Sequence, residues 1–452
     1  MRTHNPNWIA PRTGHDWRDD DVLRAVEWLK CFVPTAAMQA RLDKARATLI
    51  AAQAQWTSGG AAEAYDPADA AAWYVLQGET FATDRRLWVP EEVARTVPFL
   101  TRLGKELDGL KAISGAEARA ERLMTADKRQ PEGGLFELLV ALAYKRRGWA
   151  NVEFVPEEPG VRRTPDLHVT GPRRRWAVEC KRMMPSEYAQ REREIGRALA
   201  APVHALGLEI ARSLVVEVGY KAELRDVPDA YLAETVMDAI KGRTSGAWDD
   251  PVSFGRARDV DWTLARGVLA HDDVYFGSSR MIELLVGRYA HDADHSFAAK
   301  WRPARERPFY AEAVYQASVV SWWSLSDAAR MQKARHFQHM LAKAEGQLPS
   351  DRPGAIHVGV ESRGGNQIDA LRHIRNFAAA RTFSPANARL RWVYGNYFVP
   401  EATTQKDETW ALNETAASYR IGSHRTSEPL PGHLLVSPED EAREGVHWDG
   451  RG

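Results

Sequence analysis

The hydrophobic pattern changes character near Pro131, and this change constrains the fold more than any other feature of the sequence. A helical stretch at 131–148, "PEGGLFELLVALAYKRRG", is followed by three short runs with strand-like alternation, "NVEFVPE", "TPDLHVTG" and "RRWAVECKR". Turn residues separate the three runs. One helix followed by three closely spaced strands predicts an α/β core.

The segments on either side extend this core, because 452 residues exceed what one hydrophobic core usually organises. Helical spacing dominates before the core, and strands and helices alternate again after an aromatic-rich stretch. These late elements either complete the first sheet or build a separate one. The expected organisation is a helical region at 1–128, an α/β core at 129–220, a β-containing insertion or second domain at 221–326, α/β elements at 327–422 and a loosely ordered tail at 423–452.

Three finer expectations concern the region after the core. The pattern predicts strands at 280–289 and 309–323 and one long helix at 326–348. The stretch at 295–312, "HSFAAKWRPARERPFYAE", interleaves aromatic and basic residues, as platforms for unpaired bases do. An exposed loop with a few core aromatics also explains it, and we favour that interpretation.

The charge balance argues against a protein that holds nucleic acid through its overall field. Lysine and arginine total 61, and aspartate and glutamate also total 61, so any contact with nucleic acid needs a local patch. Cys31 and Cys180 are the two cysteines, too few for a disulfide framework or a thiolate zinc site, and the reducing cytoplasm is the expected location. No stretch approaches the ~18 uninterrupted apolar residues of a membrane span, so we expect no membrane partner.

Three charged residues stand in strand-like runs where apolar residues are expected. Side chains two apart in a strand share a face, so Glu179 and Lys181 point the same way. If the second and third runs pair as a hairpin through the turn at 171–172, Asp166 converges on Glu179. Two carboxylates suit Mg²⁺, which is commonly held by one or two carboxylates with water and phosphate oxygens, and the backbone carbonyl of Cys180 is a further candidate ligand.

A fourth charged residue, Glu137, lies alone on the helix that leads into these strands. It is the only charged residue between Gly133 and Tyr144. Its neighbours one helical turn away are small or apolar. Such a glutamate is costly unless a cation meets it, and we expect either the metal site or Lys181 to be that partner.

Taken in order, Glu137 on the leading helix, "PD" at 165–166 and "ECK" at 179–181 resemble the PD-(D/E)xK superfamily of nucleases. The resemblance covers about residues 131–220. It implies a restriction-endonuclease-like α/β fold, a mixed sheet flanked by helices, here with a helical region before it and a further α+β region after it.

The resemblance also assigns roles to the residues. It implies that Asp166 and Glu179 hold Mg²⁺, for which Mn²⁺ substitutes, that Lys181 is catalytic and that Glu137 is a supporting acid. The implied activity is phosphodiester hydrolysis, and we expect a DNA endonuclease in preference to an RNA-cutting enzyme. Analogy with such nucleases suggests bacterial genome defence. Cutting both strands of a duplex needs two active sites, which makes a homodimer plausible.

Basic residues cluster around the same segment and are candidates for contact with phosphates. The candidates for nucleic-acid contact are Arg163, Arg173, Arg174, Arg175 and Arg182. Runs of this kind also occur as ordinary solvated turns.

Two plainer interpretations stay open. In the first, Asp166, Glu179 and Lys181 form an ordinary salt bridge on a solvated strand face. In the second, the chain keeps a nuclease fold without activity and binds nucleic acid or a protein partner.

Overall fold

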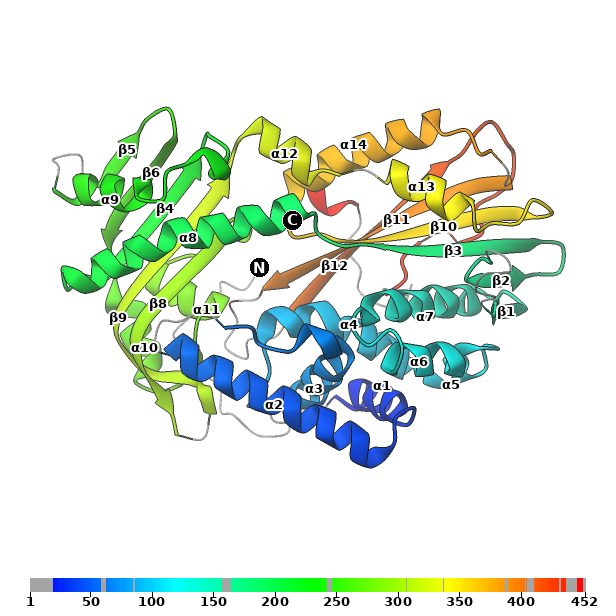
Figure 1. The fold of residues 1–452 in the computed structure, drawn as a ribbon, viewed down its shortest axis with the longest axis horizontal. Coiled ribbons are helices and arrows are strands. Elements are labelled where there is room, and N and C mark those ends of the chain that lie inside the picture. The colour runs from blue at the N-terminus through cyan, green and yellow to red at the C-terminus, as the bar shows by residue number, and fades with distance from the viewer. Residues whose placement is uncertain are drawn as a thin grey trace.

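The chain forms two mixed β-sheets with helices packed on them, and this makes it a mixed α/β protein. The computed structural model describes residues 19–449 apart from 58–61, 84–85, 157–163, 242–245, 306, 336, 387–388, 403, 405–409, 431 and 436–444. The two sheets lie side by side, and a long helix, α8 (Glu187–Glu209), bridges them (Figure 1). Within the described residues, every helix is too short or too polar to cross a membrane.

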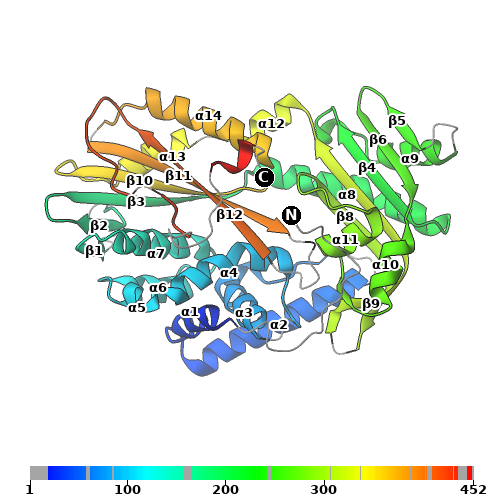
Figure 2. The ribbon, with the colours of Figure 1, turned by 180° about the vertical axis from the view of Figure 1, so that it is seen from behind.

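The region before residue 128 is helical, as its spacing predicts. Its described α-helices are α1 (Asp20–Lys30), α2 (Thr35–Thr57), α3 (Ala70–Ala82), α4 (Pro90–Lys105), α5 (Leu107–Lys111) and α6 (Ala116–Met124). Asp19 caps α1 by accepting a hydrogen bond from the Val22 amide at 3.0 Å. These helices share one continuous hydrophobic core with α7 (Pro131–Arg146) and with one face of the first sheet, along whose side they lie (Figure 2).

The first sheet contains the three strands that follow α7. Its order is β1 (Asn151–Phe154), β2 (Leu167–Thr170), β3 (Arg175–Met183), β10 (Pro353–Glu361), β11 (Arg389–Ala402) and β12 (Trp410–Arg420). β1, β2 and β3 pair antiparallel, β3, β10 and β11 run parallel, and β12 is antiparallel to β11. The late elements therefore complete the first sheet, the first of the two arrangements we considered. On the face opposite α7 the core includes α13 (Gln338–Glu345) and α14 (Asn366–Thr382).

The second sheet is built within the chain between β3 and β10. Its strands are β4 (Leu214–Tyr220), β5 (Ala247–Asp249), β6 (Ser253–Asp259), β7 (Val274–Tyr275), β8 (Asp294–Ala304) and β9 (Arg307–Ser324). We expected β4 inside the core at 129–220, but it pairs with β6 and β9 instead. The reason is α8, whose 23 residues carry the chain roughly 35 Å from the end of β3 at 1.5 Å per residue.

Helices also accompany this second sheet, and one of them replaces a strand that we predicted at 280–289. They are α9 (Tyr231–Lys241), α10 (Trp262–Leu269) and α11 (Ser279–Val286). Ser278 accepts a hydrogen bond from the Met281 amide at 3.1 Å, and Gly287, at φ +87°, closes the other end of α11. A short apolar run fits both the helix period and the strand period. Here the capping interactions at the two ends favour the helix. The strand predicted at 309–323 is present within β9.

The long helix predicted at 326–348 is two short ones, α12 (Asp327–Lys333) and α13. Side chains of α14 explain the break. The Arg372 guanidinium donates to the carbonyls of Lys333 at 3.0 Å and Arg335 at 3.3 Å. Asn376 accepts a hydrogen bond from the Phe337 amide at 3.0 Å. These tertiary bonds satisfy backbone groups that a continuous helix would have paired internally.

Two further expectations differ from the structure. The stretch at 295–312 forms strands β8 and β9 rather than a loop, and its Trp301 stacks on Phe276 with ring centroids 4.2 Å apart. The tail after 423 was expected to be loosely ordered, yet Leu430 and Leu434 are buried in the main core. Apolar residues spaced among prolines and glycines gave no periodic signal for this packing.

Candidate active site

The hairpin formed by β2 and β3 brings Asp166 and Glu179 together. Leu167 pairs with Val178, so Asp166, one residue before β2, stands opposite Glu179. The turn closes where the Gly171 amide donates to the Arg174 carbonyl at 2.8 Å. The Cys180 amide then donates to Oδ2 of Asp166 at 2.7 Å, which fixes the aspartate against β3.

Glu179 and Lys181 share the other face of β3, as strand alternation requires. Lys181 donates a hydrogen bond from Nζ to Oε1 of Glu179. The Glu179 side chain is fully buried, whereas a quarter of the Lys181 side chain remains exposed. Their parallel neighbours on β10 are Ile356 and Val358, so Glu179 lies in apolar surroundings rather than on a solvated strand face.

Glu137 has a cationic partner that we did not predict. Nη1 of Arg119, on α6, lies 2.9 Å from Oε2 of Glu137, and Nη2 lies 4.0 Å from Oδ1 of Asp166. We expected the metal site or Lys181 in this role. The signal for Arg119 was present, because it interrupts the apolar face of α6 formed by Ala116, Ala120 and Leu123, just as Glu137 interrupts the apolar surface of α7.

The cluster holds more negative charge than its surroundings tolerate. Burial raises the pKa of Glu179 to about 9, Asp166 adds to the increase, and Lys181 opposes it. Burial likewise raises the pKa of Glu137 to about 8, again with a contribution from Asp166. The pKa of each glutamate is therefore shifted toward the protonated form, and a bound cation would oppose this shift.

The pKa of Lys181 is shifted in the direction that keeps this group an ammonium. Burial alone would lower its pKa, but Glu179, through charge and a hydrogen bond, and Asp166 raise the pKa above its ordinary value. A charged Lys181 suits the stabilisation of developing negative charge better than the removal of a proton from water. Burial also raises the pKa of the Cys180 thiol well above its usual range, which leaves that side chain as an inert core group.

The donor set fits a hard divalent cation. Oε2 of Glu179 is buried and has no hydrogen-bond partner in the described chain, although an orphaned buried acceptor is costly. A cation held by Glu179 and Asp166 would satisfy this oxygen and relieve the mutual repulsion of the carboxylates. Among described residues, no three His, Cys, Asp or Glu side chains form a group that could hold a metal. The further ligands would be the Cys180 carbonyl, water and substrate oxygens.

The arginines expected to contact nucleic acid fall into different environments. Arg173, Arg174 and Arg175 are exposed at the turn of the β2–β3 hairpin, where Arg174 donates a hydrogen bond to Ser427. Arg163 lies outside the described residues. The exposed hairpin turn is therefore the part of this basic group that is open to a phosphate backbone.

Arg182 is not available for such contacts, contrary to our expectation. Its side chain is only 9% exposed, and its guanidinium carbon lies 5.1 Å from the ring centroid of Phe398 and 5.7 Å from that of Phe99. The reason is strand alternation, since Arg182 shares the face of Cys180, which points into the main core.

Beside Arg182 lies a buried charge cluster centred on Glu361, at the end of β10. Arg95 and Arg363 donate to Glu361 at 2.7 and 2.6 Å. Burial alone would raise the pKa of Glu361, but the arginines hold it well below its usual range. This network ties α4 to the carboxyl end of the parallel strands. Arg95 was not predicted, because nothing local in α4 distinguishes it from a solvated helix arginine.

Comparisons with protein-family models, with curated proteins and with solved structures found no match to this chain. The chemistry of the site alone therefore has to support a functional assignment.

Proposed function

We propose that this protein is a magnesium-dependent nuclease that hydrolyses phosphodiester bonds, with DNA as the preferred substrate and internal positions as the points of cleavage. The observation that carries the proposal is the pairing of Asp166 with the fully buried Glu179, which has an oxygen without a hydrogen-bond partner among the described residues and a charged lysine beside it. An ordinary salt bridge on a solvated strand face would not bury the Glu179 side chain completely and leave one of its oxygens without a hydrogen-bond partner.

In this proposal Asp166 and Glu179 hold the cation, with Mn²⁺ as a substitute. A cation in this position polarises the phosphoryl oxygens and lowers the pKa of a bound water. Lys181 neutralises charge that develops on the phosphate, and Glu137 with Arg119 keeps Asp166 in place. The antiparallel β1–β3 unit preceded by α7 and joined to parallel β10 is consistent with a restriction-endonuclease-like fold, which we include in the proposal.

The setting of the activity is part of the same proposal. The two free cysteines, Cys31 and Cys180, suit the reducing cytoplasm. Bacterial genome defence, by analogy, would place the enzyme there on foreign DNA. A homodimer would supply two active sites for a double-strand cut.

One observation favours a second candidate, an inactive nuclease-like module that binds nucleic acid or a protein. The guanidinium of Arg119 forms an ion pair with Glu137 and lies near Asp166. A protein side chain therefore already neutralises part of the negative charge of the cluster. Such a module would tolerate the loss of Lys181 with its binding unchanged.

Cleavage assays separate these functions. Purified protein is incubated with supercoiled plasmid, linear duplex, single-stranded DNA or RNA in Mg²⁺, Mn²⁺ or EDTA. We expect metal-dependent nicking or linearisation of plasmid, lost in Asp166→Asn and reduced at least ~100-fold in Lys181→Met. Arg266→Ala, at an exposed position on α10, is the matched control and should cut normally. Cleavage that survives both site substitutions would contradict the assignment.

A further inference from the structure

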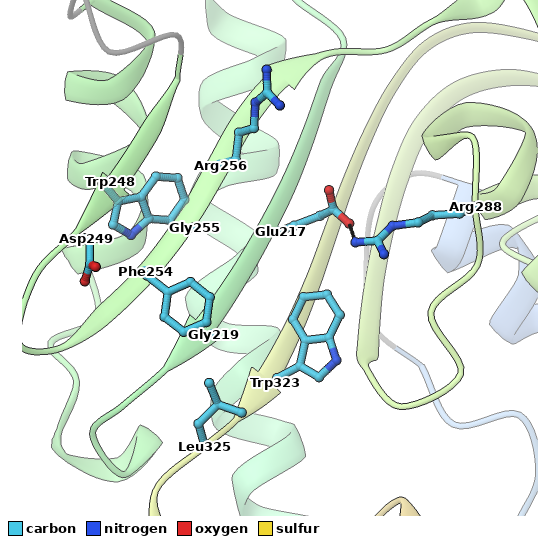
Figure 3. A pocket seen from close by; sticks show the side chains of 10 residues that line it. All are labelled: Glu217, Gly219, Trp248, Asp249, Phe254, Gly255, Arg256, Arg288, Trp323 and Leu325. Atoms are coloured by element: carbon cyan, nitrogen blue, oxygen red, sulfur yellow. Dashed lines mark hydrogen bonds and ion pairs between the residues drawn. The ribbon is translucent and has the colours of Figure 1, made fainter. Parts of the chain in front are cut away.

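A concave site lies on the second sheet and shares no residue with the carboxylate cluster. It is a pocket of about 520 Å³, within the size range of small-ligand sites. Strands β4, β5, β6 and β9 contribute its walls, where the side chains of Trp248, Phe254, Trp323 and Leu325 gather with charged groups (Figure 3). Trp248 packs partly on the core of the second sheet, whereas Phe254 is exposed, and exposed apolar surface of this kind is a candidate binding site.

Two glycines make room for these rings. A Cβ atom at Gly219 would lie 2.8 Å from Cζ of Phe254, and one at Gly255 would lie 2.4 Å from Cζ2 of Trp248. Each ring therefore lies directly against strand backbone. Glycine weakens a strand interior, and its presence there often marks a close approach of a ligand or of another chain segment.

The sheet register places two of the rings on either side of one glycine. Gly219 pairs with Phe254 on β6 and with Trp323 on β9. Strands are spaced about 4.8 Å apart, so the two aromatic residues start roughly 10 Å from each other. The Phe254 ring and Leu325 already cover Gly219 between them, so a flat ring would stack on the outer, exposed side of Phe254, within the range of about 4.5–7 Å in which aromatic rings pair. Phe254 is 44% exposed, so its ring is accessible to such a guest.

The charged residues of the pocket determine which kind of ligand it can bind. Glu217 is paired with Arg288 at 2.6 Å, and Lys221 donates to Asp249. Both acids are thus neutralised, and a cationic guest would find no free carboxylate. Arg256 is exposed and lies directly across the strand pair from Glu217. The pocket therefore presents aromatic faces with an arginine nearby, which suits a flat base joined to a phosphate.

We propose that this pocket binds an unpaired nucleobase of a single-stranded nucleic acid, stacked against Phe254 and Trp323, with Arg256 contacting an adjacent phosphate. Stacking on aromatic side chains beside a basic group is how proteins hold unpaired strands without reading their sequence. The choice of nucleic acid over another flat anion rests on the proposed nuclease function. The second sheet would then hold a displaced or unpaired strand while the first sheet carries the chemistry.

Strand binding in EDTA tests this site without cleavage. Fluorescence anisotropy of a labelled single-stranded DNA dodecamer is followed with wild type, Phe254→Ala, Arg256→Ala and Tyr315→Ala. Tyr315 is the matched control, because it is 61% exposed on β9 but is not among the pocket residues. We expect Phe254→Ala to weaken binding about 5- to 150-fold, the effect of losing one stacked base. Arg256→Ala should reduce the salt dependence by about 0.7 in the log–log slope.

The inference is overturned if Phe254→Ala and Tyr315→Ala bind alike, or if an abasic dodecamer binds the wild type as tightly as the normal strand. No binding to any strand, as a pocket for a protein partner would give, also overturns it. Cleavage in Mg²⁺ is scored separately. Strand binding through Phe254 without cleavage would contradict the nuclease proposal alone, and cleavage with no effect of Phe254 on binding would contradict the pocket alone.

Discussion

At the scale of single residues, the site is defined by charges that the fold buries at a cost. Glu179 is fully enclosed, and Glu137 keeps its place through an ion pair with Arg119. Burying carboxylates without full compensation destabilises a protein. The cation binding that we propose would make use of this buried charge.

Stability without added cation should fall as the pH rises. The folded pKa values of Glu179, about 9, and Glu137, about 8, lie above the unfolded value of about 4.3. Between these limits the folded state binds more protons than the unfolded state. The contribution of these two glutamates to stability is therefore fully present below about pH 4 and is lost as the pH rises toward 9. Melting temperatures in EDTA from pH 5.5 to 9 should decline for the wild type and decline less steeply in Glu179→Gln, in which Glu137 still titrates.

The control for that experiment is Glu117→Gln, at an exposed position on α6, which should follow the wild type. Added Mg²⁺ should raise the wild-type melting temperature most at high pH, because the carboxylates must be deprotonated to bind it. Parallel curves for wild type and Glu179→Gln in EDTA would show that the buried glutamate is ionised throughout.

Arg119 should be energetically coupled to Glu137. Arg119→Met should lower the free energy of unfolding by about 1–3 kcal/mol, because it leaves a largely buried carboxyl without its cation. Glu137→Gln added to that variant should recover part of the loss, with a coupling of at least ~0.5 kcal/mol in the double-mutant cycle measured by urea unfolding. Arg24→Met, which breaks an exposed pair with Asp108, should cost less than ~1 kcal/mol. Additive effects at Arg119 and Glu137 would rule out the coupling.

At the scale of elements, the sequence was informative where structure is decided locally. The β2–β3 hairpin follows from alternation and a turn, and so does the shared face of Glu179 and Lys181. The burial of Arg182 follows from the same alternation. It could have been predicted, because Arg182 shares a strand face with the apolar Cys180. The partner of Glu137 could not, because contact between α6 and α7 depends on helix packing. The sheet to which β4 belongs could not be predicted either, because the residue pattern of β4 is compatible with any neighbouring strand.

A close crossing of α1 and α4 should be sensitive to a single methyl group. A Cβ at Gly104 would lie 1.7 Å from the Asp21 carbonyl oxygen. Gly104→Ala should therefore destabilise the protein by at least about 1–3 kcal/mol, which outweighs the helix gain of roughly 0.5–1 kcal/mol. Gly133→Ala on α7, where nothing lies within 4 Å, should show that gain instead. Urea unfolding measures both, and equal stability of the two variants would refute the packing argument.

At the scale of the whole molecule, we propose that the first sheet carries the catalytic site and that the second sheet binds the unpaired strand. The chain leaves the first sheet after β3 through α8, builds the second sheet, and returns as β10 to complete the first. Lys333 on α12 lies 2.5 Å from the buried Glu192 on α8, which helps to join the outgoing and returning segments. With no net charge overall, any affinity for nucleic acid would have to come from local groups such as the arginines of the hairpin turn.

Duplex binding should accordingly depend on salt through few contacts. Arg173→Ser and Arg175→Ser should each lower the slope of log affinity against log salt by about 0.9, the contribution of one phosphate on duplex DNA. Arg381→Ser, at an exposed position on α14, should leave the slope unchanged. Anisotropy with a labelled 20-base-pair duplex between 50 and 200 mM salt measures the slopes. Equal slopes in all variants would place the duplex elsewhere on the surface.

Calorimetry of Mn²⁺ binding at pH 7, in two buffers of different ionisation enthalpy, tests the proposed metal site most directly. A cation held by Asp166 and Glu179 must displace protons, because the pKa of Glu179 is raised to about 9 without it. We predict binding to the wild type with release of about one proton, and no binding to Asp166→Asn or Glu179→Gln. Absence of binding to the wild type, or binding that releases no proton and survives both substitutions, would contradict the account.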